Sequence, residues 1–220
     1  MDDLESSGEV IDQTLRELEV INRLLGGNYV TTNGLARLLK DKSDKGLITI
    51  ADLGCGGGDI LKLIALWAGK QNLQVELIGF DANSHIIDYA EKNCEGYDNI
   101  RFEVQNIFSE EFKQRRFDII CCTLFTHHFT DEQLTNIFRQ FDEQSTIGTV
   151  INDLHRHWLA YYSIKLLTQL FSKSAMVKND APLSVARSFR KKDLQNIMIE
   201  AGISSHRLRW MWAFRWQLLF

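Results

Sequence analysis

The sequence predicts an α/β fold with a doubly wound, mostly parallel sheet of seven strands. Short apolar runs alternate along the chain with longer runs of helical spacing, which is typical of parallel sheets covered by helices. The first strand of this series passes into a glycine-rich turn, residues 54–58, and the turn opens a helix. Two last apolar runs lie on either side of a short turn. They predict an antiparallel C-terminal hairpin, which the edge of such a sheet tolerates.

The residues before the first strand are predicted to be helical. Apolar side chains from Val10 to Leu25 recur at helical spacing, and Gly26-Gly27 ends this helix. A second, short helix is expected over Asn33 to Leu39. We therefore expect residues 1–45 to form an N-terminal helical cap on a domain of residues 46–220, the two making one structural unit.

The alternating elements follow in order along the rest of the chain. The expected strands are Leu47–Leu53, Gln74–Phe80, Ile100–Val104, Phe117–Cys122 and Thr146–Asn152, with a hairpin of Ser205–Trp210 and Ala213–Phe220. The expected helices are Asp59–Ala68, Ser84–Cys94, Asp131–Phe141, Trp158–Phe171 and Lys191–Ala201, the last ended by Gly202. The single proline, Pro182, falls in an expected loop over 173–189, so residues 155–190 would be an inserted helix and loop over the substrate side.

Composition excludes several classes of protein. The 220 residues are 45% apolar, which suits one domain with a sizeable core. The net charge is −4, so a nucleic-acid partner is not expected. No apolar run reaches the roughly eighteen residues of a membrane span, and the acidic N-terminus argues against a signal peptide. The four cysteines form no disulfide framework, because Cys121 and Cys122 would face opposite sides of a strand. Reduced thiols in a cytoplasmic protein are expected.

The glycine turn and two carboxylates predict a nucleoside pocket. Asp52 lies near the end of the first strand, and glycines after it let the backbone approach a ligand, because no Cβ intervenes. The helix that follows offers unpaired N–H groups to a polar or anionic group. Asp81 follows the next strand, where a carboxylate suits the two hydroxyls of a ribose. These groups would meet at the carboxyl ends of neighbouring parallel strands.

The spacing of the glycines distinguishes between nucleoside cofactors. The dinucleotide fingerprint Gly-x-Gly-x-x-Gly is not met, because Asp59 or Leu61 stands at the third glycine. The pattern Asp-x-Gly-x-Gly-x-Gly over 52–58 resembles the first motif of the class I S-adenosylmethionine-dependent methyltransferases. This resemblance implies the Rossmann-like methyltransferase fold, S-adenosylmethionine as cofactor and S-adenosylhomocysteine as its product. An NAD(P)-dependent oxidoreductase, a catalytically silent cofactor-binding module and a tight turn without a ligand remain alternatives.

The same resemblance implies roles for individual residues. Asp52 would hold the cofactor ammonium, often through water, and Asp81 would take the ribose. Asn106 stands where the family usually has an acid for the adenine amine. An amide oxygen can still accept from that amine, and an Asx turn is the alternative for this residue. The residues expected to bind the cofactor are Asp52, Gly54, Cys55, Gly56, Gly58, Asp81, Ala82, Asn106, Ile107, Thr123 and Leu124.

Four of the six histidines follow the fourth and fifth strands. The pairs His127-His128 and His155-x-His157 match no standard zinc spacing, so no metal is expected. The first pair resembles a Leu-His-His-Leu run of many class I methyltransferases, in which one ring packs inward and frames the cofactor. A phenolic acceptor with a pKa near ~10 needs a base, which histidine can supply. We expect His155 to be that base, oriented by Asp153, with a helix-start hydrogen bond as the alternative. Further substrate candidates are Tyr29, His127, Asn152, Arg156, Tyr161 and Arg187.

A second resemblance covers the whole chain. The segments 21–27, 150–162 and 180–189 are similar to a bacterial subgroup of small-molecule methyltransferases, relatives of which occur beside type III polyketide synthases and flavin oxidoreductases. The resemblance implies a small-molecule acceptor of phenolic or quinone type.

The elements around the predicted site could enclose such an acceptor. Helix 10–25, a turn over Gly26–Thr32 and the loop 173–189 would form a lid. Its expected walls are Tyr29, Trp158, Tyr161, Tyr162, Phe171 and Met176. The aromatic residues of the terminal hairpin leave two interpretations open, a homodimer face or ordinary core.

Overall fold

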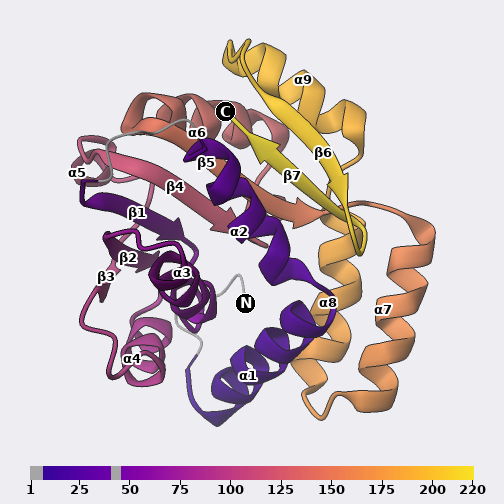
Figure 1. Cartoon of the computed structure of the whole chain (residues 1–220). Helices are drawn as coiled ribbons and strands as arrows, with labels where there is room; N and C mark the ends of the chain where they lie inside the picture. The colour runs from indigo at the N-terminus through magenta and orange to yellow at the C-terminus, as the bar shows by residue number, and fades with distance from the viewer. Residues whose placement is uncertain (1–6, 41–45) are drawn as a thin grey trace.

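The computed structural model describes residues 7–40 and 46–220 (Figure 1). Its centre is one seven-stranded sheet with the order β3-β2-β1-β4-β5-β7-β6. Strand β7 runs antiparallel to both of its neighbours, and the first five strands pair in parallel. The strands are β1 (Ile48–Leu53), β2 (Val75–Asp81), β3 (Ile100–Val104), β4 (Phe117–Thr123), β5 (Ser145–Leu154), β6 (Arg207–Met211) and β7 (Arg215–Leu219). The predicted fold class, including the antiparallel hairpin at the edge, is confirmed.

Helices cover both faces of the sheet, so the central strands are apolar on both sides. Ile50 of β1 faces one core cluster and Ala51 faces the other. The same alternation separates Cys121 from Cys122, as predicted from the period of a strand. One face is covered by α2 (Gly27–Leu38), α3 (Asp59–Lys70) and α4 (Ser84–Asn93), and the other by α5 (Glu110–Lys113), α6 (Asp131–Gln144) and α9 (Lys191–Ala201).

Local capping explains why several helices begin and end where they do. The Asn83 side chain accepts from the N–H groups of His85 and Ile86, which starts α4 directly after β2. Thr130 and Gln133 form a capping box at the start of α6. Gly202 has φ 79° and ends α9, as its position in the sequence predicts. These caps let each helix leave the sheet close to the strand that precedes it.

Three helices lie beyond the carboxyl ends of the parallel strands (Figure 1). They are α1 (Glu9–Leu24), α7 (Trp158–Phe171) and α8 (Ala175–Arg187). The Glu17 carboxylate accepts from the Ser172 hydroxyl and from the N–H groups of Lys173 and Ser174, which ties α1 to the turn between α7 and α8. On its other side, α1 contacts α4 through Asp12 and His85, whose side chains are 2.9 Å apart.

Two expectations about the helices near the strand ends, α8 and α2, are wrong. The predicted loop 173–189 is mostly helix α8, although it contains Pro182. The Ser174 side chain caps this helix at Val177, and the buried Val177, Pro182 and Val185 pack it in place, so tertiary packing outweighs the proline. The predicted Gly26–Thr32 turn is also wrong, because α2 begins at Gly27. Gly26 alone, with φ 73°, makes the turn from α1.

The N-terminal helices differ in what they cover. Helix α2 packs on the sheet through buried Val30 and Leu35, whereas α1 lies beside α8. The division into a cap of residues 1–45 and a domain of residues 46–220 stays a prediction. Within residues 7–40 and 46–220, no helix combines the length and the apolar character needed to cross a bilayer.

Candidate active site

The glycine turn after β1 forms the floor of the site. Gly54, Gly56 and Gly58 have φ values of 67°, 51° and 79°, a conformation that side chains other than glycine rarely adopt. A Cβ on Gly54 would lie 2.2 Å from the Phe125 ring. At Gly56 the nearest side chain, Leu15 of α1, would be 3.8 Å away. The turn is therefore bare backbone, with an aromatic ring on one side and helix α1 on the other.

Asp52, near the end of β1, has a buried carboxylate whose hydrogen bonding is incomplete. The residue is 2% exposed, and its Oδ1 has no hydrogen-bond partner among the described residues. Burial, together with the nearby carboxylates of Asp59 and Asp81, raises the pKa of Asp52 to about 8. A cationic group brought next to Asp52 would stabilise its ionised form, lower its pKa and complete the carboxylate's hydrogen bonding.

Asp81 ends β2 and lines a pocket beside the turn. Its Oδ1 accepts from the Asn83 N–H at 3.0 Å, and the N–H groups of Gly56 and Ala82 also bond to the carboxylate. Burial raises the pKa of Asp81, and these three hydrogen bonds act in the opposite direction. The backbone thus fixes a carboxylate at the pocket wall, where it can accept from the hydroxyls of a ligand.

The pocket has a volume of about 360 Å³ and lies at the strand ends, where the sequence predicts a site. Seven of the eleven residues expected there line it, namely Gly54, Gly56, Asp81, Ala82, Asn106, Ile107 and Leu124. Aromatic rings that we did not predict, including Phe125 and Phe129, line it as well. These rings supply the flat apolar walls that suit a purine.

Four of the expected residues do not line this pocket. Asp52 is buried near the end of β1, and Cys55 is buried in the core cluster of β1 and α3. Gly58 packs against Cys94 and Phe102, where a Cβ would come within 2.7 and 2.8 Å of their side chains. Thr123 faces α2, and its hydroxyl lies 3.0 Å from that of Thr31. For the last three, the structure shows a packing role.

Asn106 lines the pocket and also forms the Asx turn that the sequence left as the alternative. Its Oδ1 accepts from the Phe108 N–H at 2.9 Å. A carbonyl oxygen has a second lone pair, so this bond leaves the amide able to contact a ligand.

A second, apolar cavity of about 320 Å³ adjoins the nucleoside pocket. The two share Leu124 and His128, which lie between them. Leu124 has φ 56°, an unfavourable conformation for leucine that is held by its N–H bond to the Asn152 carbonyl at 2.9 Å. The cavity walls come mainly from α1, α7, α8 and the end of the β6–β7 hairpin, with aliphatic residues such as Leu18, Ile21, Leu25, Ile164, Ala181 and Val185.

One titratable pair lies at the wall of this cavity. The His127 Nδ1 is 2.8 Å from the Asp153 Oδ1, and both side chains are buried. The other oxygen, Oδ2, accepts from the Thr126 hydroxyl at 2.6 Å and from the His127 N–H at 3.1 Å. Burial alone would raise the pKa of Asp153, but His127 and these hydrogen bonds hold it below its ordinary value. The His127 Nε2 is buried with no partner among the described residues, and His127 lines the cavity.

The arrangement agrees with comparisons to known proteins. A protein family described as a methyltransferase domain matches residues 44–202. The chain belongs to this methyltransferase family. The resemblance to class I S-adenosylmethionine-dependent methyltransferases is thereby confirmed at the level of family and fold.

Individual relatives are distant. The methyltransferase is 26% identical over 127 residues to phosphoethanolamine N-methyltransferase of Plasmodium falciparum, and the match covers 56% of this chain and 46% of that protein. It thus spans about half of this curated relative.

Solved structures support the fold alone, because their sequences are less than 25% identical. An O-methyltransferase family protein of Burkholderia thailandensis has a TM-score of 0.66 and 13% identity, with 95% of this chain and 58% of that one covered. Human N-acetylserotonin methyltransferase, solved with SAM, has a TM-score of 0.63 and 15% identity, with 95% and 55% covered. Magnesium protoporphyrin IX methyltransferase of Synechocystis, solved with bound SAH, has a TM-score of 0.54 and 16% identity, with 88% and 83% covered.

The predicted pairing of His155 with Asp153 is not found in the methyltransferase, because Asp153 faces His127 instead. The His155 ring lies against Trp216, with ring centroids 4.9 Å apart, and does not line the apolar cavity. Burial lowers the pKa of His155, as do electrostatic interactions with His157 and Arg190. The helix-start hydrogen bond belongs to His157, whose Nδ1 accepts from the Leu159 N–H at 3.2 Å.

The other substrate candidates fall mostly outside the cavity. Tyr29 is 63% exposed on α2, and Arg156 bonds to Asp193 at 2.5 Å. Arg187 is exposed at the end of α8, and Tyr161 packs beside the core cluster of α7 and α8. Asn152 is fully buried, and its amide bonds to the Gly27 carbonyl, Thr31 and Arg215. Of the six candidates, only His127 lines the cavity in the described part of the chain.

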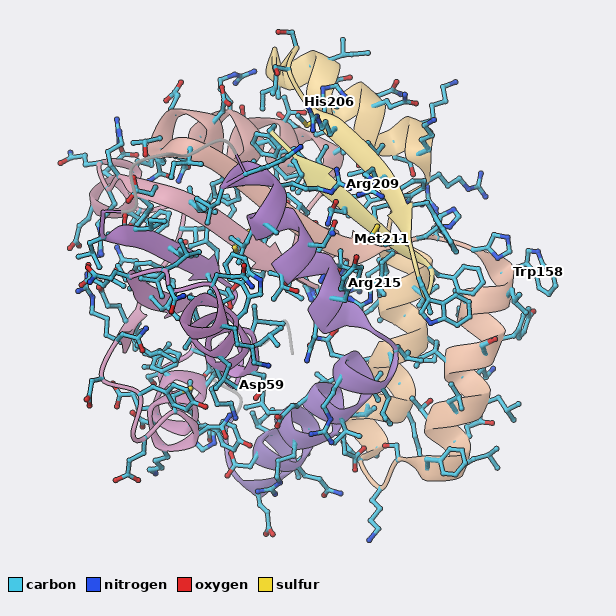
Figure 2. The ribbon with its side chains drawn as sticks, viewed as in Figure 1. Asp59, Trp158, His206, Arg209, Met211 and Arg215 are labelled. Atoms are coloured by element: carbon cyan, nitrogen blue, oxygen red, sulfur yellow. The ribbon has the colours of Figure 1, made fainter. Side chains whose placement is uncertain are left out.

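None of the six predicted wall residues lines this cavity, although Phe171 lines a neighbouring groove between α1 and α7. Trp158, Tyr162 and Phe171 are exposed along α7, and Figure 2 shows Trp158 at the outer edge of the molecule. Tyr29 is exposed on α2, Tyr161 packs beside the cavity without lining it, and Met176 packs with Ile11 and Ile86. Aliphatic residues of α1, α7 and α8 form the walls in their place.

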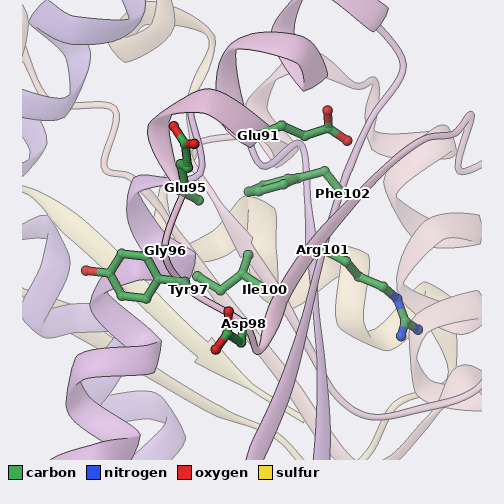
Figure 3. Close-up of a pocket in the computed structure, with 9 residues that line it drawn as sticks. Glu91, Glu95, Gly96, Tyr97, Asp98, Ile100, Arg101 and Phe102 are labelled. Atoms are coloured by element: carbon green, nitrogen blue, oxygen red, sulfur yellow. The ribbon is translucent and has the colours of Figure 1, made fainter.

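A third hollow lies away from these two. It has a volume of about 340 Å³ and lies at the start of β3, lined by residues such as Glu91, Glu95, Asp98 and Arg101 (Figure 3). Because it is at the amino end of a parallel strand, it does not belong to the site. Among residues 7–40 and 46–220, no group of three His, Cys, Asp or Glu side chains could hold a metal ion.

Proposed function

We propose that the protein is an S-adenosylmethionine-dependent methyltransferase whose acceptor is an apolar small molecule of phenolic or quinone type. One observation carries the proposal. The nucleoside pocket at the strand ends meets a second, apolar cavity across Leu124 and His128. A donor bound in the first pocket and an acceptor bound in the second would therefore adjoin each other, which methyl transfer requires.

The residues of the first pocket fit this cofactor. The orphaned carboxylate oxygen of Asp52 suits the ammonium of its amino-acid part, and the bare turn of Gly54 and Gly56 leaves room for that part. Asp81 is placed to accept from the ribose hydroxyls, and Asn106 and Ile107 line the region expected for the base. When bound, the cofactor supplies an activated methyl group on a sulfonium, so the protein has mainly to position the acceptor and exclude water.

Helix α1 would exclude water from both pockets. Leu15 lies over the glycine turn, and Leu18 and Ile21 of the same helix line the acceptor cavity. Contacts of α1 with α4 and with the α7–α8 turn come mainly from side chains, so the helix can act as the predicted lid with Gly26 as its hinge.

His127 is the base in this proposal, in place of His155. Asp153 accepts from Nδ1, which assigns the proton to that nitrogen and leaves the Nε2 lone pair free. His127 can then take the proton of an acceptor hydroxyl as the oxygen becomes a nucleophile, and Asp153 stabilises the resulting cation. Asp153 does not touch the acceptor, so it is a positioning residue.

The experiment is a transfer assay with tritiated S-adenosylmethionine and a small panel of acceptors. The panel holds 5-pentylresorcinol, a reduced short-chain benzoquinone and a matched compound with both phenolic oxygens already methylated. We expect product only from the acceptors with free hydroxyls. Binding of the cofactor without product from any of these acceptors would favour the catalytically silent module.

The same assay tests the base. His127→Gln should lower kcat by about 100-fold or more and leave the affinity for S-adenosylhomocysteine within threefold of wild type. His206→Gln, on the loop before β6, is the control and should change neither quantity. A loss in His127→Gln of less than tenfold would remove this histidine from catalysis. The cytoplasmic location and the homodimer stay predictions from the sequence.

A further inference from the structure

A buried positive charge lies in the wall of the acceptor cavity. Arg215 is the first residue of β7, is 2% exposed and lines the cavity. Figure 2 shows it inside the molecule, near the start of α2 and the lower end of the hairpin. Among the described residues, no other lysine or arginine lines this cavity. An arginine in this position needs an explanation, since charged side chains are almost never fully buried unless paired.

The partners of Arg215 are neutral. Its Nη1 donates to the Asn152 Oδ1 at 3.2 Å, and its Nη2 donates to the Asn22 Oδ1 at 2.9 Å. Its Nε is buried without a partner, and no carboxylate forms an ion pair with it in the described part of the chain. The amide oxygens position the guanidinium, but they do not neutralise its charge.

Two carboxylates lie in the neighbourhood, and both have other partners. Asp153 attracts Arg215 at a distance but is held by His127 and Thr126. Asp180 of α8 also lines the cavity and has an interaction of its own. Burial lowers the pKa of Arg215 to about 10, so the guanidinium stays charged at neutral pH. The cavity therefore holds one fixed cation whose charge the protein does not directly pair.

We propose that the acceptor is an apolar organic acid, whose anionic oxygens bind the Arg215 guanidinium inside the cavity. An anion there would provide the missing counter-charge in a site from which water is largely excluded, where such a pair is strong. This inference rests on the proposed function, because it names the acceptor of that reaction.

The shape of the cavity places the rest of the acceptor. The acid group would lie at Arg215, and the methylated atom would lie at the junction with the nucleoside pocket, next to Leu124 and His128. An apolar groove of about 570 Å³ between α1 and α7 shares Ile21 and Leu25 with the cavity. It offers an aliphatic tail a continuous path toward the surface. The predicted acceptor thus has an acidic group, an apolar body and a separate methylated atom.

Binding of two matched fluorescent probes tests the proposal without requiring methyl transfer. N-phenyl-1-naphthylamine and 1-anilinonaphthalene-8-sulfonate differ only in the sulfonate. Titrations at pH 8 keep ordinary histidines neutral. Wild type should bind the sulfonate probe at least about tenfold more tightly than the neutral one, which is the ratio expected for one charge-assisted pair. Equal affinities in wild type would overturn the proposal.

Variants locate the charge that the probe detects. Arg215→Gln should abolish the preference, and Arg215→Lys should keep most of it. Arg16→Gln is the matched control, because Arg16 is exposed and lines the connected groove. A preference lost in Arg16→Gln and kept in Arg215→Gln would assign the anion to the groove and overturn the proposal. If Arg215→Gln does not fold, Ala181→Phe takes its place, because its larger side chain fills the cavity. The proposal is then supported if the preference for the sulfonate probe persists in Arg16→Gln and is lost in Ala181→Phe.

Calorimetry with S-adenosylhomocysteine on the same samples separates the two proposals. Wild type that binds this ligand but does not distinguish the probes would overturn the acidic acceptor and leave the methyltransferase intact. Wild type that distinguishes the probes but does not bind S-adenosylhomocysteine would overturn the proposed function and leave the anion site in place.

Discussion

Replacing Asp52 with asparagine should stabilise the unliganded protein and lower its affinity for the cofactor. The carboxylate is buried, and its Oδ1 has no partner among the described residues. The pKa of Asp52 is about 8 in the folded state against an ordinary 3.8. Asparagine keeps the shape of the side chain and cannot ionise, so the comparison isolates the charge.

The sign of the pH dependence follows from the direction of this shift. Below the ordinary pKa, both the folded and the unfolded chain hold the proton, and the group does not disfavour folding. As the pH rises toward the folded pKa, the unfolded chain alone releases its proton, so stability falls by about 1.4 kcal/mol for each pH unit. Between pH 5 and pH 8, wild type should lose up to roughly 4 kcal/mol relative to Asp52→Asn. Chemical unfolding of both proteins at each pH measures the difference.

Ligand binding provides the second half of this prediction. The ammonium of S-adenosylhomocysteine stabilises the ionised form of Asp52, so binding at pH 7 should release a proton. Its affinity should improve by up to about tenfold per pH unit from pH 6 to pH 8. 5′-Methylthioadenosine lacks the amino-acid part but has the same nucleoside, so its affinity should change little with pH. Calorimetry in buffers of different ionisation enthalpy measures both the affinity and the proton release.

Two variants make the test specific. In Asp52→Asn, the affinities for the two ligands should follow similar pH trends. Asp59→Asn removes a neighbouring carboxylate at the start of α3 and should keep the difference between the two pH trends that wild type shows. A steep pH dependence for S-adenosylhomocysteine in Asp52→Asn would refute the reasoning, because the titrating group would then lie elsewhere. Equal pH trends for the two ligands in wild type would refute it as well.

Two further predictions concern the turn and the lid. Gly56→Ala should cost about 1 kcal/mol of stability in thermal melts, because its φ is positive, and Gly54→Ala should cost more, because its Cβ would also lie 2.2 Å from the Phe125 ring. Only Gly54→Ala should also weaken S-adenosylhomocysteine binding tenfold or more, since its Cβ drives the Phe125 ring into the pocket; similar affinities for the two variants would contradict this. Glu17→Gln weakens the tie between α1 and α8, so amide exchange in α1 should speed up several-fold without a change in the sheet. Unchanged exchange in α1 would show that Glu17 does not hold the lid.

Much of the fold could be predicted because its signals are local. The strand Ile100–Val104 and the helices Trp158–Phe171 and Lys191–Ala201 have the bounds that their apolar patterns indicate. Helix α8 was missed because Pro182 is a local signal against a helix, and the contacts that overcome it come from α1 and α7.

Helix α2 was cut short in the prediction for a related reason. Its sequence is rich in glycine and threonine, which disfavour helices locally. The structure shows why glycine is needed, since a Cβ on Gly34 would lie 2.6 Å from Val150 of β5, and one on Gly27 would clash with Asn22 and Arg215. Close packing of a helix on a sheet leaves no periodic signal that a single sequence can reveal.

The two halves of the site differ in the same way. The nucleoside pocket could be predicted because the order of parallel strands places Asp81 and the glycine turn at one edge of the sheet. The acceptor cavity could not, because α1, α7, α8 and the hairpin meet only in three dimensions. The partner of Asp153 was assigned to the nearest histidine in the chain, whereas the structure selects His127, 26 residues away. No motif marks Arg215, whose importance follows only from its burial.

The most direct test of the account is a calorimetric titration of purified protein, freed of any bound ligand, with S-adenosylhomocysteine at pH 8. We predict saturable binding at one site per chain with a dissociation constant in the micromolar range, and a loss of at least tenfold in Asp52→Asn. An absence of heat up to millimolar ligand, from protein that unfolds cooperatively, would contradict the assignment of this pocket to the cofactor.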